Sequence, residues 1–126
     1  PHRILVVDDD TRVIQLIKKI LTTSNLNLDV RTTQSGLEAL ILAGDFRPQL
    51  VILDIHLAEV EGQQILASLK TKMSGHPCKV LMMSGDADSL QAAAEQGADD
   101  YLLKPFPGRE LIQKMVALLG IERRAR

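Results

Sequence analysis

Five polar side chains that could take part in chemistry stand at the ends of short apolar runs. Asp8 and Asp9 follow the first run, and Asp54 ends another. Ser84 and Lys104 follow two further runs. In open α/β sheets, groups at the carboxyl ends of the strands point into the crevice where ligands bind. If each run is a strand of one sheet, we expect these side chains to meet at a single edge.

Several carboxylates at one edge repel each other and need a counter-charge. Two unit charges about 4 Å apart cost about 4 kcal/mol at an effective dielectric constant of about 20. A hard divalent cation removes this cost, and Mg²⁺ prefers one or two carboxylates, retained waters and phosphate oxygens. Lys104 adds a positive charge suited to a phosphate, and Ser84 adds a donor for a phosphoryl oxygen. These groups therefore indicate metal-assisted phosphoryl transfer onto a carboxylate.

Each of these residues taken alone has a plainer interpretation. Ser84 alone would be a loop hydroxyl, and Lys104 alone would be a solvated surface charge. Asp10, the third acidic residue after the first run, is expected to cap the following helix rather than bind a metal. The argument for function is that chemically suited residues recur at four strand ends.

Three other phosphate-handling motifs are excluded by the sequence. The loop after the first apolar run contains no glycine, so the glycine-rich turn that binds a dinucleotide is absent. The chain has no GxxxxGK[ST] loop. An aspartate-nucleophile phosphatase of the haloacid dehalogenase type would need Thr or Val where Arg12 stands, and the chain offers no cap domain.

Apolar runs alternate with helical periodicity along the whole chain. We expect strands at about 4–7, 25–33, 50–53, 78–83 and 101–103. We expect helices at about 11–21, 36–43, 62–73, 88–96 and 109–119. The run Leu50–Leu53 is typical of a central strand buried on both faces. Strict alternation of strands and helices predicts one α/β domain, with a parallel sheet, right-handed crossovers and helices on both faces.

Two helix boundaries carry specific expectations. Ser35 with Glu38 fits a capping box, and Leu37, Leu40 and Ile41 begin the apolar stripe of that helix. Gly44 and Pro48 are expected to end the same helix before the central strand.

Composition limits the class of protein. The chain has 126 residues, enough to bury a core, with 45% hydrophobic and 25% charged residues. Its net charge of −1 gives no reason to expect nucleic-acid or membrane binding, and no apolar run approaches membrane-spanning length. The single cysteine, Cys78, fits a reducing, cytoplasmic setting. Because the first residue is Pro1, we expect a chain that was processed or cut from something longer.

The residues resemble the receiver domain of two-component response regulators, of the chemotaxis-response-regulator kind. The carriers are Ile4–Asp10, Leu50–Asp54, Ser84–Gly85 and Lys104–Phe106, in the family's order and spacing. The resemblance implies a flavodoxin-like, doubly wound, five-stranded parallel sheet with strand order 2-1-3-4-5. It also implies a receiver domain at residues 1–120, and we expect residues 121–126 to begin a linker or C-terminal tail.

The resemblance implies a role for each matched position around the metal. Asp54 matches the phosphoacceptor. Asp9 matches the carboxylate that binds the metal directly, and Asp8 matches its partner. His56, two residues after the acceptor, would offer its backbone carbonyl to the metal. The implied ion is Mg²⁺ or Mn²⁺, bound by Asp8, Asp9, Asp54 and the His56 carbonyl.

The resemblance also implies a switch. Ser84 matches the hydroxyl that moves towards the phosphoryl group, and Lys104 matches the lysine that pairs with it. Lys104–Pro105 matches the family's cis peptide, and Tyr101 matches the switch aromatic residue. Pro107 stands where a polar residue commonly caps the last helix, so capping there must come from elsewhere.

As implied by this family, the chain is a phosphorylation-activated switch rather than an enzyme acting on a metabolite. It catalyses only its own Mg²⁺-dependent phosphorylation and dephosphorylation. The expected donor is a phosphohistidine on a sensor histidine kinase or a histidine phosphotransfer protein. The surface formed by 88–96, 101–103 and 109–119 would act on an output domain or partner, or form a homodimer. The alternative is a degenerate receiver that binds partners without phosphorylation.

Overall fold

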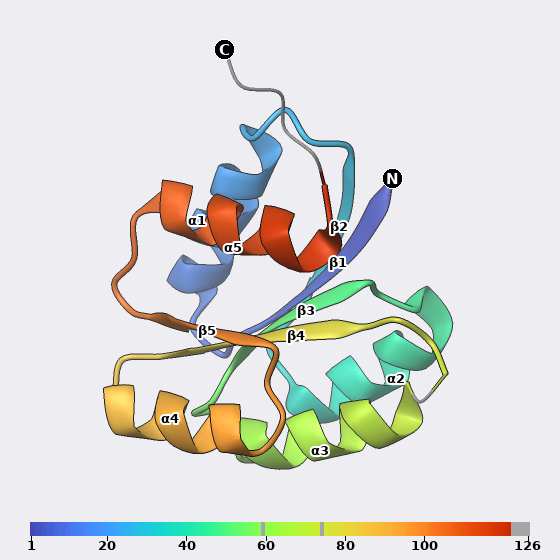
Figure 1. Cartoon of the computed structure of the whole chain (residues 1–126), viewed down its shortest axis with the longest axis vertical. Helices are drawn as coiled ribbons and strands as arrows, with labels where there is room; N and C mark the ends of the chain where they lie inside the picture. Colours follow the sequence, from blue (N-terminus) through green and yellow to red (C-terminus); the bar gives the residue numbers. More distant parts are fainter. Residues whose placement is uncertain (59, 74, 122–126) are drawn as a thin grey trace.

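Five parallel strands form the central sheet of the computed structural model, which describes residues 1–58, 60–73 and 75–121 (Figure 1). The strands are β1 (His2–Val7), β2 (Leu28–Thr33), β3 (Leu50–Asp54), β4 (Lys79–Ser84) and β5 (Asp100–Leu103). The helices are α1 (Thr11–Thr22), α2 (Gly36–Phe46), α3 (Gly62–Lys72), α4 (Ala87–Glu95) and α5 (Gly108–Leu119). The strand order is β2-β1-β3-β4-β5, which confirms the predicted flavodoxin-like topology.

The central strands are buried on both faces. All five residues of β3 are buried, and Ile4–Val7 of β1 have no exposed surface. A strand covered on both faces needs apolar residues at consecutive positions, which explains the unbroken runs in the sequence. β2 lies at an edge of the sheet and is only partly buried.

Two apolar cores lie on opposite faces of the sheet. Leu5, Val7 and the matching residues of β3 pack against α2, α3 and α4, whereas Ile4 and Val6 pack against α1 and α5. Figure 1 shows these two helix layers, with α1 and α5 above the sheet and α2, α3 and α4 below it. Because side chains alternate between the faces of a strand, one apolar run supplies both cores.

The helix that follows β2 differs from the prediction in two respects. It continues through Gly44 to Phe46, and its C-cap Arg47, which precedes Pro48, has a left-handed φ of 52°. It continues because Phe46, in its last turn, is buried in the core. The prediction of its apolar stripe was also wrong, because Ala39 and Ala43 face the core, whereas Leu37 and Ile41 are exposed. Small alanines let the helix lie close to the sheet, so the larger side chains point outward.

The helix starts are determined by local hydrogen bonds. The Asp10 carboxylate accepts from the Arg12 N–H at the start of α1, which confirms Asp10 as a cap. The Ser35 hydroxyl accepts from the Glu38 N–H. The predicted capping box is only half formed, because the Ser35 N–H donates to the Thr33 hydroxyl. Pro107 precedes α5 with no side-chain cap, as expected.

Among the described residues, no helix combines the length and apolarity needed to cross a bilayer.

We expect Gly62→Ala to destabilise the fold by about 1 to 3 kcal/mol, because it overpacks the turn beside the end of β3. A Cβ at Gly62 would lie 2.7 Å from Ile55 Cα and 2.9 Å from the Ile55 carbonyl oxygen, and would also overlap the Asp54 carbonyl oxygen. Urea unfolding measures the change. Gly85→Ala is the control, since a Cβ there meets nothing within 4 Å. Equal stability of the two variants would contradict the close approach.

Candidate functional site

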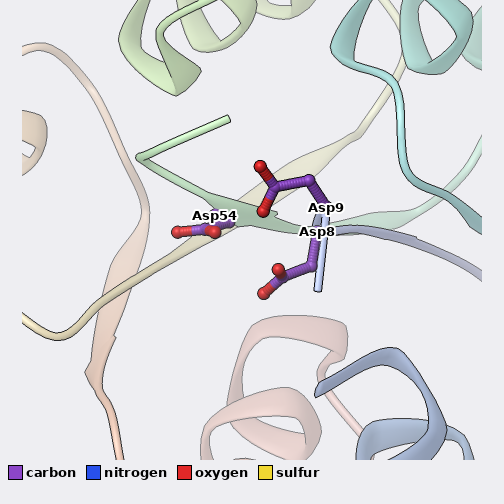
Figure 2. A group of neighbouring side chains, drawn as sticks. All are labelled: Asp8, Asp9 and Asp54. Atoms are coloured by element: carbon purple, nitrogen blue, oxygen red, sulfur yellow. The ribbon is translucent and has the colours of Figure 1, made fainter. Parts of the chain in front are cut away.

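Three carboxylates meet at the carboxyl ends of β1 and β3. Pairing of Val7 with Leu53 aligns the two strand ends, so that Asp8 lies beside Asp54. One carboxylate oxygen from each of Asp8, Asp9 and Asp54 lies within 4.8 Å of the others (Figure 2). Asp8 is fully buried, Asp54 is 6% exposed and Asp9 is exposed. The arrangement combines two buried negative charges with a third that solvent can reach.

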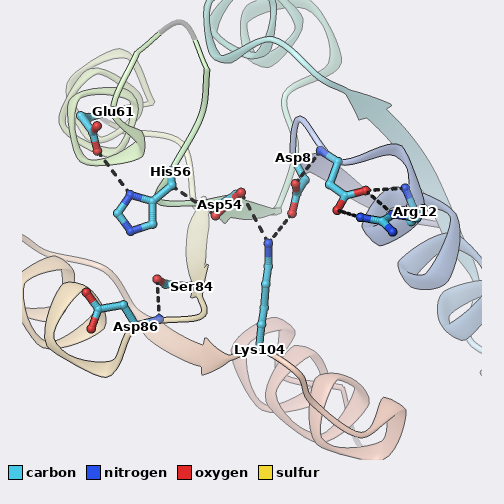
Figure 3. Close-up of polar contacts among 9 residues, drawn as sticks. Asp8, Arg12, Asp54, His56, Glu61, Ser84, Asp86 and Lys104 are labelled. Carbon is cyan, nitrogen blue, oxygen red and sulfur yellow. Dashed lines mark hydrogen bonds and ion pairs between the residues drawn. The ribbon is translucent and has the colours of Figure 1, made fainter.

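Lys104 reaches this cluster from the end of β5. Its Nζ lies 2.7 Å from Asp8 Oδ2 and 3.4 Å from Asp54 Oδ2 (Figure 3). Its backbone N–H donates to the Ser84 carbonyl at 2.8 Å, and the Lys104–Pro105 peptide is cis, as the resemblance implied. One ammonium group thus bridges the two buried carboxylates.

The pKa values show that this charge balance is incomplete. Burial, followed by the negative charge of Asp8, raises the pKa of Asp54 to about 6, although Lys104 and the His56 N–H act in the opposite direction. Burial by itself would lower the pKa of Lys104. Its hydrogen bond to Asp8 and the charges of Asp54 and Asp8 outweigh burial, so the pKa of Lys104 is raised. One lysine therefore does not fully offset burial and the Asp8 charge at Asp54, and an added cation would stabilise the ionised carboxylates.

The loop between β3 and α3 is closed tightly around Asp54. The His56 N–H donates to Asp54 Oδ1 at 3.2 Å, and the Gly62 N–H donates to the Ile55 carbonyl at 2.6 Å. The His56 side chain is 57% exposed, and its Nδ1 lies 3.8 Å from Glu61 Oε2. The imidazole therefore points towards Glu61 and away from Asp54, while the backbone N–H of His56 remains beside Asp54.

Ser84 is buried at the end of β4, where its Oγ accepts from the Asp86 N–H at 3.0 Å. Asp86 in turn caps α4 by accepting from the Asp88 N–H and the Ser89 hydroxyl. These bonds, the Ser89 bond first, lower the pKa of Asp86. Tyr101 is 48% exposed on β5, with Lys114 Nζ 5.5 Å from its ring centroid. The aromatic ring is thus on the surface, separate from the carboxylate cluster.

Two features of the site were missed in the sequence. Ser89 Oγ lies 3.4 Å from His56 Nε2, which links the start of α4 to the loop after β3. The spacing of Asp86 and Ser89 is typical of a helix start, but it carries no signal for the contact with His56. An apolar groove of about 350 Å³ also borders Lys104. It is lined by Val13, Leu16, Lys104, Pro105 and Phe106. The signal for the groove was Leu16, an apolar residue outside the buried stripe of α1.

In metal-free buffer, we expect Asp54→Asn to stabilise the fold at pH 7.5 by about 1 to 3 kcal/mol, because it removes a buried charge. The pKa of Asp54 is raised from 3.8 to about 6, so the folded protein binds the proton more tightly than the unfolded chain. This contribution to stability is complete below pH 3.8 and is lost as the pH rises through 6. The difference in the free energy of unfolding between Asp54→Asn and the unsubstituted chain should therefore vanish near pH 3.5.

Urea unfolding with EDTA, repeated across this pH range, tests the prediction. Asp10→Asn is the control, because hydrogen bonds from Arg12 lower the pKa of Asp10 and the change in stability has the opposite sign. A stability gain for Asp54→Asn that did not depend on pH would contradict the assigned cause.

Known proteins resemble most of the chain. A family model for the response regulator receiver domain matches residues 4–116. The transcriptional regulatory protein PrrA of Mycobacterium tuberculosis is 38% identical over 117 residues, which cover 93% of this chain and 49% of PrrA. The response regulator MprA of Mycobacterium sp. (strain KMS) is 36% identical over 119 residues, 94% of this chain and 51% of MprA.

A solved structure agrees with these sequence relatives. The receiver domain of NtrX from Brucella abortus superposes with a TM-score of 0.84 at 30% sequence identity, and covers 94% of this chain and 99% of that one. The chain spans about half the length of PrrA and MprA. Family model, sequence relatives and fold all agree, and the chain belongs to the receiver domain family of two-component response regulators.

Proposed function

We propose that this chain is a signalling switch that accepts a phosphoryl group on Asp54 from a phosphohistidine. The observation that supports this proposal is the bridge of Lys104 to Asp8 and Asp54, with Asp9 adjacent. A nucleophilic carboxylate, a metal-binding set and a cation for phosphate lie together. The chain is thus a switch that catalyses its own phosphorylation and dephosphorylation, and not an enzyme with a separate substrate.

Asp8, Asp9, Asp54 and the backbone carbonyl of His56 would hold Mg²⁺ or Mn²⁺. Carboxylate and carbonyl oxygens are the ligands that these hard cations prefer, and the three carboxylates approach within the range that one ion spans. The raised pKa of Asp54 supports this fit, because burial and then the charge of Asp8 disfavour the ionised carboxyl, and a bound cation would offset both effects. When bound, the ion neutralises charge on the carboxylates and on the transferring phosphoryl oxygens.

Each residue at the site has a part in the transfer. A carboxylate oxygen of Asp54 attacks the phosphorus, the bond from phosphorus to the histidine nitrogen breaks, and its electron pair stays on the imidazole. Lys104 shifts from Asp8 towards the new phosphoryl oxygens. Ser84 already accepts from the Asp86 N–H, so its own hydroxyl hydrogen can be donated to the phosphoryl group. The transfer needs no group besides these residues, the ion and the donor.

The added charge would change the surface formed by α4, β5 and α5. Ser84 ends β4 directly before α4, and Lys104 follows β5, so movement of both side chains acts on that surface. Tyr101, already half-exposed on β5, would turn inward with Ser84. We propose that this surface then contacts an output domain or partner, or forms a homodimer. Moving the ratio of the active to the inactive conformation from 1:99 to 99:1 needs about 5.5 kcal/mol of differential interaction.

The donor would be a sensor histidine kinase or a histidine phosphotransfer protein. The apolar groove beside Lys104 would bind an apolar segment of this donor and so hold its phosphohistidine near Asp54. Residues 1–120 form the receiver domain in this proposal. Residues 121–126 would begin a linker or tail, and 122–126 lie outside the described residues. We propose a cytoplasmic location and no direct contact of this domain with nucleic acid or membrane.

A degenerate receiver that acts without phosphorylation is the second candidate. The exposed apolar groove is the observation that favours it, because binding there requires no charge change. Beryllofluoride, a phosphoryl mimic, separates the two candidates. We expect it to shift the amide NMR signals of Asp54, Ser84 and Lys104 only when Mg²⁺ is present. Unchanged spectra at saturating beryllofluoride and Mg²⁺ would favour the degenerate receiver.

We expect Asp54→Asn to abolish labelling by a small phosphodonor such as acetyl phosphate in Mg²⁺, because asparagine offers no nucleophilic carboxylate. Intact-protein mass spectrometry measures the added phosphoryl group. Asp29→Asn on β2 is the control and should label at the rate of the unsubstituted chain. Full-rate labelling of Asp54→Asn would show that the acceptor is a different residue.

A further inference from the structure

The outer side of α2 is unusually apolar for a surface helix. Leu37 is 55% exposed, and Ile41, at 68%, is the most exposed large apolar side chain among the described residues. A helix that packs on a sheet normally presents polar residues to solvent. The core side of α2 is formed by other residues, Ala39, Ala43 and Phe46, so neither exposed side chain is needed inside. This pattern indicates that a further surface covers α2.

The exposed Leu37 and Ile41 and the partly buried Leu40 belong to one continuous strip. At about 100° per residue, Leu40, Gly44, Leu37 and Ile41 follow one another around the outer side of the helix. We name these four residues the α2 strip. At its Leu40 edge, the strip borders a groove of about 450 Å³ between α2 and α3. The groove is lined by Leu40, Ala67, Ser68, Thr71 and Lys72. Figure 1 shows α2 and α3 side by side on one face of the sheet.

Opposite charges lie on the two sides of Leu37 and Ile41, the most exposed part of the α2 strip. Glu38 and Asp45 are exposed on the Ile41 side. On the Leu40 side, Lys72 Nζ would lie 3.4 Å from a Cβ added at Gly44. Asp45 follows Gly44 directly, so Asp45 and Lys72 are at nearly the same height along the helix axis. No ion pair among the described residues involves Glu38, Asp45 or Lys72.

We propose that the α2 strip binds the same strip of a second copy of this chain, with the two α2 helices parallel. A two-fold axis parallel to α2 exchanges the two sides of the strip. It therefore places Asp45 of one copy opposite Lys72 of the other, at the same height, and forms the pair twice. The apolar residues, Leu37 and Ile41 foremost, lie between these two pairs.

Charge selects this pairing over the other symmetric one. An antiparallel pair of α2 helices would place the acidic sides of both copies together, so that Glu38 and Asp45 of one copy face the same residues of the other. Like charges facing each other oppose association, whereas opposite charges fix the orientation of an interface. The charges on both sides of the strip are thus complementary to a parallel copy of the same surface.

This interface is separate from the phosphorylation site and from the α4–β5–α5 surface. The carboxylates and Lys104 lie at the carboxyl ends of the strands, whereas Leu37 and Ile41 are exposed on the side of α2 opposite its buried residues. Dimerisation through α2 therefore requires no phosphoryl group. A surface centred on one helix of 11 residues is small, so we expect a weak, reversible dimer.

Sedimentation velocity on the unphosphorylated chain tests the proposal. We expect a monomer–dimer equilibrium up to about 500 µM protein, and Ile41→Arg should abolish the dimer. Because Ile41 is exposed, this variant should fold normally, which circular dichroism checks. Asp45→Lys should raise the dimer Kd at least about tenfold, since it faces Lys72 of the other copy.

A charge reversal gives the sharpest result. Adding Lys72→Asp to Asp45→Lys restores both pairs, so the Kd should return to within about threefold of the original value. Glu95→Lys on α4 makes the same change in net charge and should leave the Kd unchanged. A chain that is monomeric throughout, or a dimer that survives Ile41→Arg, would overturn the proposal. Failure of the double reversal to restore the dimer would overturn the parallel pairing.

Discussion

The ion pairs of Lys104 with Asp8 and Asp54 are the interaction on which the site depends. They connect the end of β5 with the ends of β1 and β3, across 96 positions of sequence between Lys104 and Asp8. A single ammonium group reaches two buried carboxylates, but it does not offset burial and the charge of Asp8, which together raise the pKa of Asp54. The ion pairs of Lys104 therefore hold this edge of the sheet together, but the edge carries more negative than positive charge. A further cation at this site would stabilise the buried carboxylates.

The backbone makes this arrangement possible. Parallel pairing brings Asp8 and Asp54 to the same level, and the absence of a side chain at Gly62 lets the following loop close against Asp54 and Ile55. The strands themselves contribute only apolar residues to the two cores. Chemistry is thus confined to strand ends and loops, and its geometry depends on a rigid sheet that takes no part in the reaction.

Sequence patterns were enough to predict the sheet, its helices and the meeting of Asp8, Asp9, Asp54 and Lys104, because long apolar runs determine where parallel strands end. Sequence patterns did not predict which side of α2 faces the core, or where α2 ends. That helix is apolar nearly all round, so periodicity could not distinguish its inner side from its outer side, and the packing of Phe46 overrode the usual effect of Gly44. The bond from the Asp86 N–H to Ser84 and the contact between His56 and Ser89 also depend on tertiary structure, which spacing alone does not encode.

The position of Tyr101 has a practical consequence. The chain contains no tryptophan and one tyrosine, so its near-ultraviolet fluorescence comes almost entirely from this ring. The ring is half in solvent, with the Lys114 ammonium near its face. A change in polarity or quenching at β5 would alter that emission without a contribution from elsewhere in the protein. The molecule therefore carries its own optical reporter, and no dye or engineered label is needed to follow this part of the surface in real time.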